Sequence, residues 1–216
     1  MMMNDISRAY FYAKATRDIF IELPPEDPEY GKSDFIGQLR LCFYGTREAV
    51  LNWQETLSQH LVESGLTRGV GFPSVFYHRE WDIWTLVHGD DYFSTGSVES
   101  LAWLEQTLAK KYEIKTQKVG HSPGCKVEGQ ILNRVIRATS EGFEVEADPR
   151  HAELILEQLQ LEQGKGLSAP GNDDHDETTE EAEEILLGEE ATAFRGMAAR
   201  CNYLAADRPD IMFSVK

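Results

Sequence analysis

The sequence predicts an α+β fold, in which an antiparallel sheet packs against a few helices. The order of the predicted elements along the chain supports this class. Short β-prone segments and amphipathic helical segments follow one another in an irregular order, and that order lacks the regular strand–helix alternation of a doubly wound sheet. The chain has 216 residues, of which 41% are hydrophobic and 27% charged, which suffices for one substantial core or for two small lobes.

The first part of the chain predicts two extended segments and one helix. A short extended start reaches Asp5, and residues 18–25 alternate between apolar and polar side chains before two prolines end the pattern. Residues 47–65 predict a helix that ends at a glycine. Its apolar stripe consists of Val50, Trp53, Leu57 and Leu61.

The middle of the chain predicts three strands and a second helix. Residues 74–78, 83–87 and 92–95 are β-prone and are joined by short connections. Ser97 is a favourable N-cap, because its side-chain oxygen can accept a hydrogen bond from a backbone N–H of the first turn. The apolar positions of this helix are Leu101, Leu104 and Leu108.

The last third predicts two strands followed by helices. Residues 126–139 and 142–147 are β-prone, with a turn between them. Asp148-Pro149 predicts a helix start, since aspartate caps a helix and proline fits its first position. A last helix is expected over 191–206, and Pro209 could open another.

Charge is unevenly distributed along the chain. The net charge of −16 divides into −6 for residues 1–150 and −10 for residues 151–216. Ten acidic residues lie between Asp173 and Glu190, where no Lys or Arg occurs, so we interpret 168–190 as a solvated acidic linker. This distribution argues against a uniformly basic nucleic-acid binder, whereas contact with nucleic acid through a limited groove stays open. Recruitment of a basic partner by the acidic segment is a further hypothesis.

Targeting and cysteine patterns restrict the class of protein. No apolar run approaches the roughly 18 residues that a membrane span needs, and the N-terminus lacks the pattern of a secretory signal, so we expect neither a membrane protein nor secretion. Cys42, Cys125 and Cys201 lie about eighty residues apart, which argues against a disulfide scaffold and favours a reducing compartment. His121 and Cys125 are two candidate ligands without partners, which is too few for zinc.

Two adjacent carboxylates are the sharpest chemical feature. Asp90 and Asp91 lie between two β-prone runs, which places them at the tip of a hairpin. An isolated pair of this kind is more often an exposed turn. Carboxylate oxygens are, however, the ligands that Mg²⁺ prefers, and Asp5 is the candidate for the further carboxylate that two metal ions would need.

Four ordered segments carry a family resemblance: DISRAYFYAKATRDIFIELPPE, LRLCFYGTREAVLNWQETLSQHLVESGLTRGVGFPSVFYH, TLVHGDDYFSTG and AARCNYLAADRPDIMFSV. They are similar, in this order, to blocks of the reverse transcriptase of Ty1/copia-type retrotransposons. The family has an aspartate opening, a Leu-Tyr-Gly-Leu-Lys-Gln block with a downstream tryptophan, a Tyr-Val-Asp-Asp hairpin and a late Tyr-Leu-Ala block. The resemblance extends over nearly the whole chain.

The resemblance implies a polymerase palm and an RNA-directed DNA polymerase activity. Asp5 would be the first catalytic aspartate, and Asp90 and Asp91 would be the hairpin pair. Two Mg²⁺ ions, with Mn²⁺ as a substitute, would be held by these three carboxylates in a two-metal nucleotidyl transfer. Asp5 and Asp90 would bridge both ions, and Asp91 would have the more dispensable role.

The resemblance also implies residues that contact nucleotide and template. Tyr10 matches the aromatic residue that packs under the sugar and excludes a ribose 2′-hydroxyl. Tyr44-Gly45 and Arg47 match positions at the template and nucleotide. His88 replaces the usual tyrosine of the hairpin and could donate a hydrogen bond toward the primer, and Gly89 replaces a valine or methionine and is expected to loosen the turn.

The expected organisation has three parts. Residues 1–167 would form the palm and an adjoining thumb-like region, 168–190 the linker, and 191–216 a helical segment leading toward an RNase H region. The expected partners are an RNA template, a DNA primer, deoxynucleoside triphosphates and the rest of a Pol polyprotein, with its fingers, RNase H and integrase, and no membrane. The expected location is intracellular, in a cytoplasmic particle or the nucleus. Since only four residues precede Asp5, we expect a truncated chain, and a catalytically inactive remnant or a binding module stays an alternative.

Overall fold

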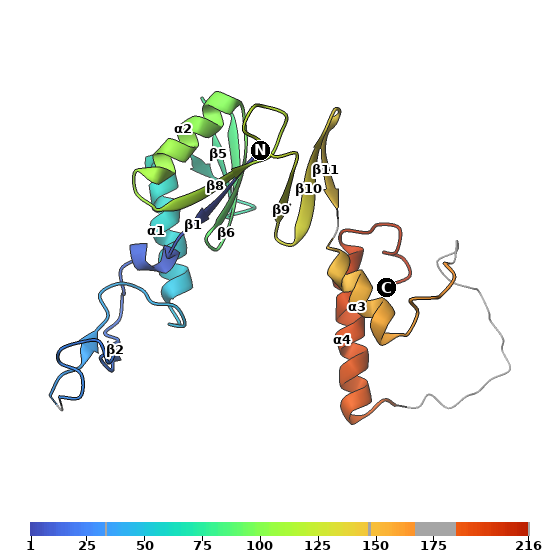
Figure 1. The fold of residues 1–216 in the computed structure, drawn as a ribbon, viewed down its shortest axis with the longest axis horizontal. Coiled ribbons are helices and arrows are strands. Elements are labelled where there is room, and N and C mark those ends of the chain that lie inside the picture. The colour runs from blue at the N-terminus through green and yellow to red at the C-terminus, as the bar shows by residue number, and fades with distance from the viewer. Residues whose placement is uncertain (33, 147, 167–184, 216) are drawn as a thin grey trace. The chain divides into compact units, whose positions relative to one another are not determined.

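The computed structural model describes residues 1–32, 34–146, 148–166 and 185–215 (Figure 1). They belong to two compact units, Met1–Gly129 and Gln130–Lys216, which are described separately. Among the described residues, no helix is both long and apolar enough to cross a membrane.

The first unit is built on a six-stranded sheet with the order β4-β5-β6-β7-β1-β8. Its strands are β1 (Met2–Ile6), β4 (Thr67–Arg68), β5 (Val75–His78), β6 (Ile83–His88), β7 (Asp91–Thr95) and β8 (Ile114–Lys118). Every neighbouring pair is antiparallel. The N-terminal strand β1 therefore lies inside the sheet, between β7 and β8, and brings the start of the chain beside the β6–β7 hairpin.

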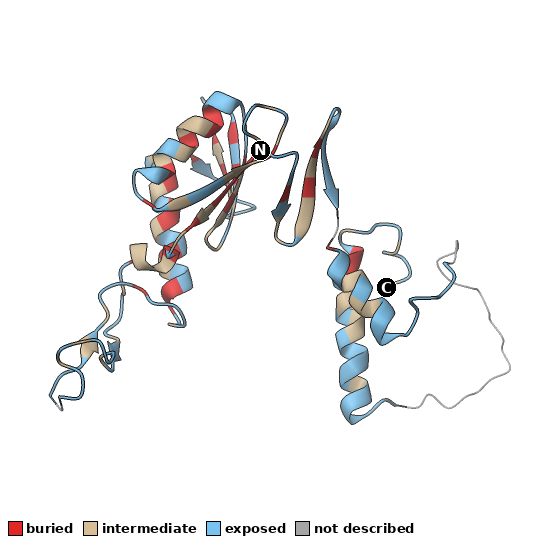
Figure 2. Cartoon of the chain, viewed as in Figure 1, coloured by how far each residue is buried: buried red, intermediate tan, exposed pale blue. Residues whose placement is uncertain are grey.

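Two helices, α1 (Ala49–Glu63) and α2 (Val98–Ala109), contribute to one core with the sheet (Figures 1 and 2). The predicted stripe of α1 is confirmed at Trp53 and at the two leucines that follow it, whereas Val50 is exposed and Ala49 is buried in its place. In α2 the predicted cap is confirmed, since the Ser97 side chain accepts a hydrogen bond from the Ser100 amide at 3.1 Å. The core residues of the two helices are Ala49, Trp53, Leu57, Leu61, Leu101, Leu104 and Leu108.

The segment between β1 and α1 contains little regular structure. It has a short 3₁₀ helix, η1 (Ala9–Tyr12), and a pair of two-residue strands, β2 (Phe20–Ile21) and β3 (Gly37–Gln38). The extended segment expected over 18–25 is therefore reduced to two paired residues. Both residues of β2 are exposed, so no core lies behind them to extend the ladder.

The second unit contains a three-stranded sheet with the order β11-β10-β9. Its strands are β9 (Glu128–Ile131), β10 (Arg134–Thr139) and β11 (Gly142–Glu146), and the boundary between the units falls within β9. The single strand expected over 126–139 is wrong, because Leu132 and Asn133 have φ values of 46° and 67°. These left-handed conformations make the pair a two-residue turn, and Asn133 was the local signal for it.

The described part of the second unit also contains two helices, α3 (Pro149–Gln158) and α4 (Gly188–Ala205). The cap of α3 is confirmed: an Asp148 carboxylate oxygen accepts a hydrogen bond from the Arg150 amide at 3.0 Å. Helix α4 begins within the expected acidic linker, of which residues 168–184 lie outside the described residues. The helix expected from Pro209 is absent from 209–215, where the chain forms turns. An ion pair between Arg208 and Asp210, which are too close in sequence to be helical neighbours, accompanies this turn.

Candidate active site

The antiparallel ladder places Asp5 and Asp91 directly opposite each other. Asp5 on β1 has Asp91 on β7 and Lys115 on β8 as its two Cα partners. Because opposite residues point to the same face of a sheet, these three side chains share one face. Asn4 precedes Asp5 and Tyr92 follows Asp91, and these two neighbours also form a ladder pair. Both are buried on the opposite face, toward the helices. Asp5 and Asp91 therefore lie on the face that the helices leave uncovered.

Asp90 occupies the tip of the hairpin between β6 and β7. His88 and Asp91 are partners in the ladder, so the loop consists of Gly89 and Asp90 alone. Gly89 has a φ of 65°, and Asp90 is not among the residues with a positive φ. A positive φ at the first central position is typical of a type II′ turn, in which glycine is favoured there. Gly89 thus suits the conformation of this turn, and the expected loosening of the turn stays a prediction.

Backbone hydrogen bonds fix the hairpin tip against the neighbouring strand. The Ile6 amide donates to the Asp90 carbonyl at 3.0 Å, directly after Asp5 in the chain. The peptide group between Asp5 and Ile6 is therefore hydrogen-bonded to the backbone of Asp90. The three aspartates thus lie together at one end of β1.

Burial and the charges of the neighbouring carboxylates affect the pKa of Asp91. Burial raises the pKa of Asp91 above its usual range, the charges of Asp90 and Asp5 raise it further, and His88 opposes the rise. On the other side of Asp5, the Lys115 ammonium lies 3.4 Å from a carboxylate oxygen and partly compensates the negative charge. The cluster thus carries a net negative charge, with the Lys115 ammonium at its edge.

The chemistry of these donors fits a hard divalent cation. Ionised aspartates offer only acceptor oxygens, and a bound cation would relieve the repulsion by Asp90 and Asp5, which adds to the effect of burial on the pKa of Asp91. In the described part of the chain, however, no group of three or more His, Cys, Asp or Glu side chains is arranged around a common metal position. The carboxylates share a region without converging on one point.

Two tyrosines lie next to the aspartates. Tyr10 on η1 and Tyr44 on the loop before α1 meet edge to face, with ring centroids 4.6 Å apart. The pKa of Tyr44 is raised by burial, then by the charges of Asp90, Tyr10 and Asp5. The structure therefore brings both predicted nucleotide-contacting tyrosines to the candidate metal site.

The other predicted residues differ in their relation to this cluster. His88 is exposed at the end of β6 and, as the ladder partner of Asp91, shares its face. Gly45 has a φ of 83°, with open space where a Cβ would be, so the backbone there is accessible. Arg47 is exposed in the turn that precedes α1.

Sequence reasoning missed two residues of the site. Lys115 is one of several lysines near β8, and only the register of β8 on β1 singles it out. Trp53 was expected in the core, where it lies, but its indole Nε1 also donates to the Gly89 carbonyl at 2.8 Å. No local pattern could have signalled either contact, because both depend on how distant segments pack.

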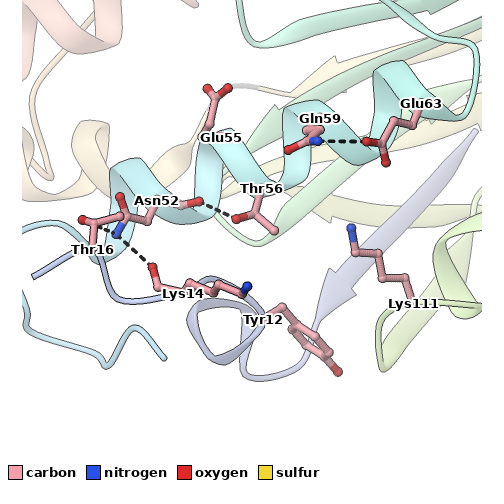
Figure 3. Close-up of a pocket in the computed structure, with 9 residues that line it drawn as sticks. All are labelled: Tyr12, Lys14, Thr16, Asn52, Glu55, Thr56, Gln59, Glu63 and Lys111. Carbon is pink, nitrogen blue, oxygen red and sulfur yellow. Dashed lines mark hydrogen bonds between the residues drawn. The ribbon is translucent and has the colours of Figure 1, made fainter. Parts of the chain in front are cut away.

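A pocket of about 460 Å³ lies elsewhere, between α1 and the segment after η1 (Figure 3). Its polar groups bond to one another: the Asn52 side chain donates to the Lys14 carbonyl and to the Thr16 hydroxyl at 3.2 and 3.1 Å. None of the predicted site residues lines it. The lining residues are Tyr12, Lys14, Thr16, Asn52, Glu55, Thr56, Gln59, Glu63 and Lys111.

Comparison with known proteins supports a retroelement origin. No family model matches the chain. It is 28% identical over 171 residues to the transposon Ty1-NL2 Gag-Pol polyprotein of Saccharomyces cerevisiae, covering 77% of this chain and 10% of the relative. It is 22% identical over 216 residues to the retrovirus-related Pol polyprotein from transposon RE2 of Arabidopsis thaliana, covering 98% of this chain and 14% of the relative.

The chain is similar to a segment of Ty1/copia-type retrotransposon Pol polyproteins. It spans about a tenth of the length of the curated relatives that it matches. The similarity thus supports the interpretation that the chain is a retroelement-derived segment.

Proposed function

We propose that this chain is the catalytic, palm-like part of a reverse transcriptase from a copia-type Pol polyprotein. One observation carries the proposal: β1 brings Asp5 to the face and end of the sheet where the hairpin carries Asp90 and Asp91. The similarity to Pol polyproteins is an independent support.

In this proposal Asp5, Asp90 and Asp91 hold two Mg²⁺ ions, for which Mn²⁺ can substitute. Bound divalent ions would neutralise charge on a triphosphate and lower the pKa of a primer 3′-hydroxyl. The ladder gives Asp91 the position opposite Asp5, whereas Asp90 lies in the turn. Asp91 would contribute to the site from its position opposite Asp5, and its more dispensable role stays the expectation that the resemblance implies.

The tyrosines would position the incoming deoxynucleotide. Tyr10 would pack under the sugar, and Tyr44 supports it, because the two rings are in edge-to-face contact. His88 and the accessible backbone at Gly45 would contact primer and template. An RNA template, a DNA primer and deoxynucleoside triphosphates are the substrates that this arrangement would take, with the rest of a Pol polyprotein as partner.

Primer extension on an RNA template tests the proposal. The full chain is assayed with Mg²⁺ or Mn²⁺ beside the Asp5→Asn, Asp90→Asn and Asp82→Asn variants. Asp82 is the matched control, because it lies in the turn between β5 and β6 with a φ of 44°, which asparagine also tolerates. Extension should fall at least about a hundredfold in the Asp5 and Asp90 variants and persist in the control. Undiminished extension by Asp90→Asn would refute the assignment of the site.

A catalytically inactive remnant is the second candidate. Two observations favour it: the net charge of −16, and the lack of a converged three-ligand group among the described residues. A chain that unfolds cooperatively yet neither extends primers nor binds Mn²⁺ would support this candidate over the polymerase.

A further inference from the structure

Trp53 lies between the hydrophobic core and the hairpin that carries Asp90. Its side chain is fully buried, and its ring meets that of Tyr112 edge to face, with centroids 5.4 Å apart. A buried indole N–H needs an acceptor. Here the acceptor is the Gly89 carbonyl in the hairpin turn, at 2.8 Å from Nε1.

The position of the Gly89 carbonyl in the turn explains why it is available as an acceptor. In a two-residue turn the closing hydrogen bond joins the residues on either side of the loop, so the carbonyl of the central peptide group is left over. The indole of α1 takes up this carbonyl, which belongs to the peptide between Gly89 and Asp90. The indole thus reaches the peptide group directly before the candidate metal ligand Asp90.

Asp90 is held from both of its flanking peptide groups. Trp53 binds the peptide before it, and the Ile6 amide donates to its own carbonyl at 3.0 Å. The two anchors come from α1 and from β1, and β1 also carries Asp5. The backbone of Asp90 is therefore fixed relative to both other aspartates.

The anchor opposes an identifiable force. Asp5, Asp90 and Asp91 lie together and carry like charges when ionised, so they repel one another, and the hairpin tip is the part of the cluster outside the ladder. The hydrogen bond from the core to the tip opposes this repulsion.

We propose that Trp53 is a positioning residue of the candidate active site, which fixes the Gly89–Asp90 peptide so that Asp90 is placed for cation binding. This role rests on the proposed function. Trp53 touches neither cation nor substrate and acts through the backbone of the turn.

The test compares Mn²⁺ binding by the full chain and two variants, Trp53→Phe and Trp103→Phe. Phenylalanine keeps an aromatic ring and removes the N–H. Trp103 on α2 is the matched control, since it stacks on Trp81 with centroids 5.4 Å apart, away from the hairpin. Losing one hydrogen bond should weaken Mn²⁺ binding about fivefold to tenfold in Trp53→Phe and leave it unchanged in Trp103→Phe. Hydrogen exchange of the Ile6 amide should accelerate only in Trp53→Phe.

A second variant guards against a packing defect. Replacing Trp53 with 3-benzothienylalanine keeps the bicyclic shape and removes only the N–H, so it should reproduce the loss of Mn²⁺ affinity with little loss of thermal stability. Unchanged Mn²⁺ affinity in this variant would overturn the positioning role, even if Trp53→Phe were unstable. The proposed function itself would fail if the unsubstituted chain bound no Mn²⁺. It would also fail if the Asp90→Asn variant bound Mn²⁺ as tightly as the unsubstituted chain does.

Discussion

The two units of the chain differ in how they bury apolar surface. In Met1–Gly129, side chains from the sheet and two helices form one cluster in which Trp53, Ile83 and Leu104 are fully buried. In the described part of the second unit, the buried hydrophobic residues are Ile136, Ala138, Leu204 and Ala205, and helix α3 has none.

The second unit relies more on polar contacts. Arg134 donates to Asp207 at 2.8 Å and lies over the ring of Tyr203, which also meets His151. Such partly exposed contacts each stabilise a fold by about 1 kcal/mol or less. The candidate site thus lies in the unit with the larger buried core.

The largest expected effect is a core truncation in the first unit. Leu104→Ala should lower the free energy of unfolding of this unit by about 3 kcal/mol, because it leaves a cavity among fully buried neighbours. Urea unfolding followed by tryptophan fluorescence measures it selectively, since all four tryptophans lie in this unit. A change below about 1 kcal/mol would contradict the dense core.

The matching truncation in the second unit should have a smaller effect. Leu204→Ala is expected to lower stability by about 1 kcal/mol, since the thinner packing around α4 can relax into the space. Hydrogen exchange of α3 and α4 should speed up, and the tryptophan transition should not move. Equal losses for Leu104→Ala and Leu204→Ala would remove the difference between the units.

A pH dependence is expected in the first unit through His60. His60 on α1 packs edge-on against Tyr112, and burial, followed by the charge of Lys111, lowers its pKa below the ordinary 6.5. The unfolded chain therefore binds more protons below about pH 6.5, so stability should fall as the pH decreases from 7 to 5.

Solvent access to His60 limits the size of this effect to less than about 1 kcal/mol. His60→Gln should flatten the pH dependence of the tryptophan-detected urea midpoint. His151→Gln in the second unit is the control and should leave it as it is. A urea midpoint that rises on acidification, and no longer does so in His60→Gln, would contradict the prediction. It would mean that folding stabilises the protonated form of His60.

The smallest expected effect is a gain in stability at the candidate site. The raised pKa of Asp91, caused by burial and then by Asp90 and Asp5, means that folding disfavours its ionised form. Asp91→Asn should therefore stabilise the first unit at pH 7 by about 0.5 kcal/mol, a value that allows for solvent screening of a partly exposed carboxylate. The gain should disappear as the pH falls through the carboxylate range.

Asp82→Asn, in the other hairpin turn, is the control and should give no comparable gain. The measurement is the urea midpoint at pH 7 and at pH 3, compared with Mn²⁺ binding, which Asp91→Asn should weaken. A loss of stability at pH 7 in Asp91→Asn would show that the carboxylates do not strain the fold.

Local signals in the sequence determined much of the secondary structure. The stripe through Trp53 fixed the buried face of α1, and the caps at Ser97 and Asp148 set the starts of α2 and α3. These succeed because helix periodicity and capping involve residues within a few positions of one another. The strand expected over 18–25 failed because a strand also needs a core behind it and a partner beside it.

By itself, the sequence determined that an aspartate pair accompanies a hairpin and, through its family resemblance, that Asp5 belongs with it, but only Asp90 lies in the turn, since Asp91 is the first residue of β7. Only the tertiary structure decided that Asp91 faces Asp5, that Lys115 flanks it and that Trp53 anchors the turn. The physical reason is that strand register and helix-to-turn contacts join residues far apart in the chain. They are set by which faces the core buries together, and no short stretch of sequence encodes that choice.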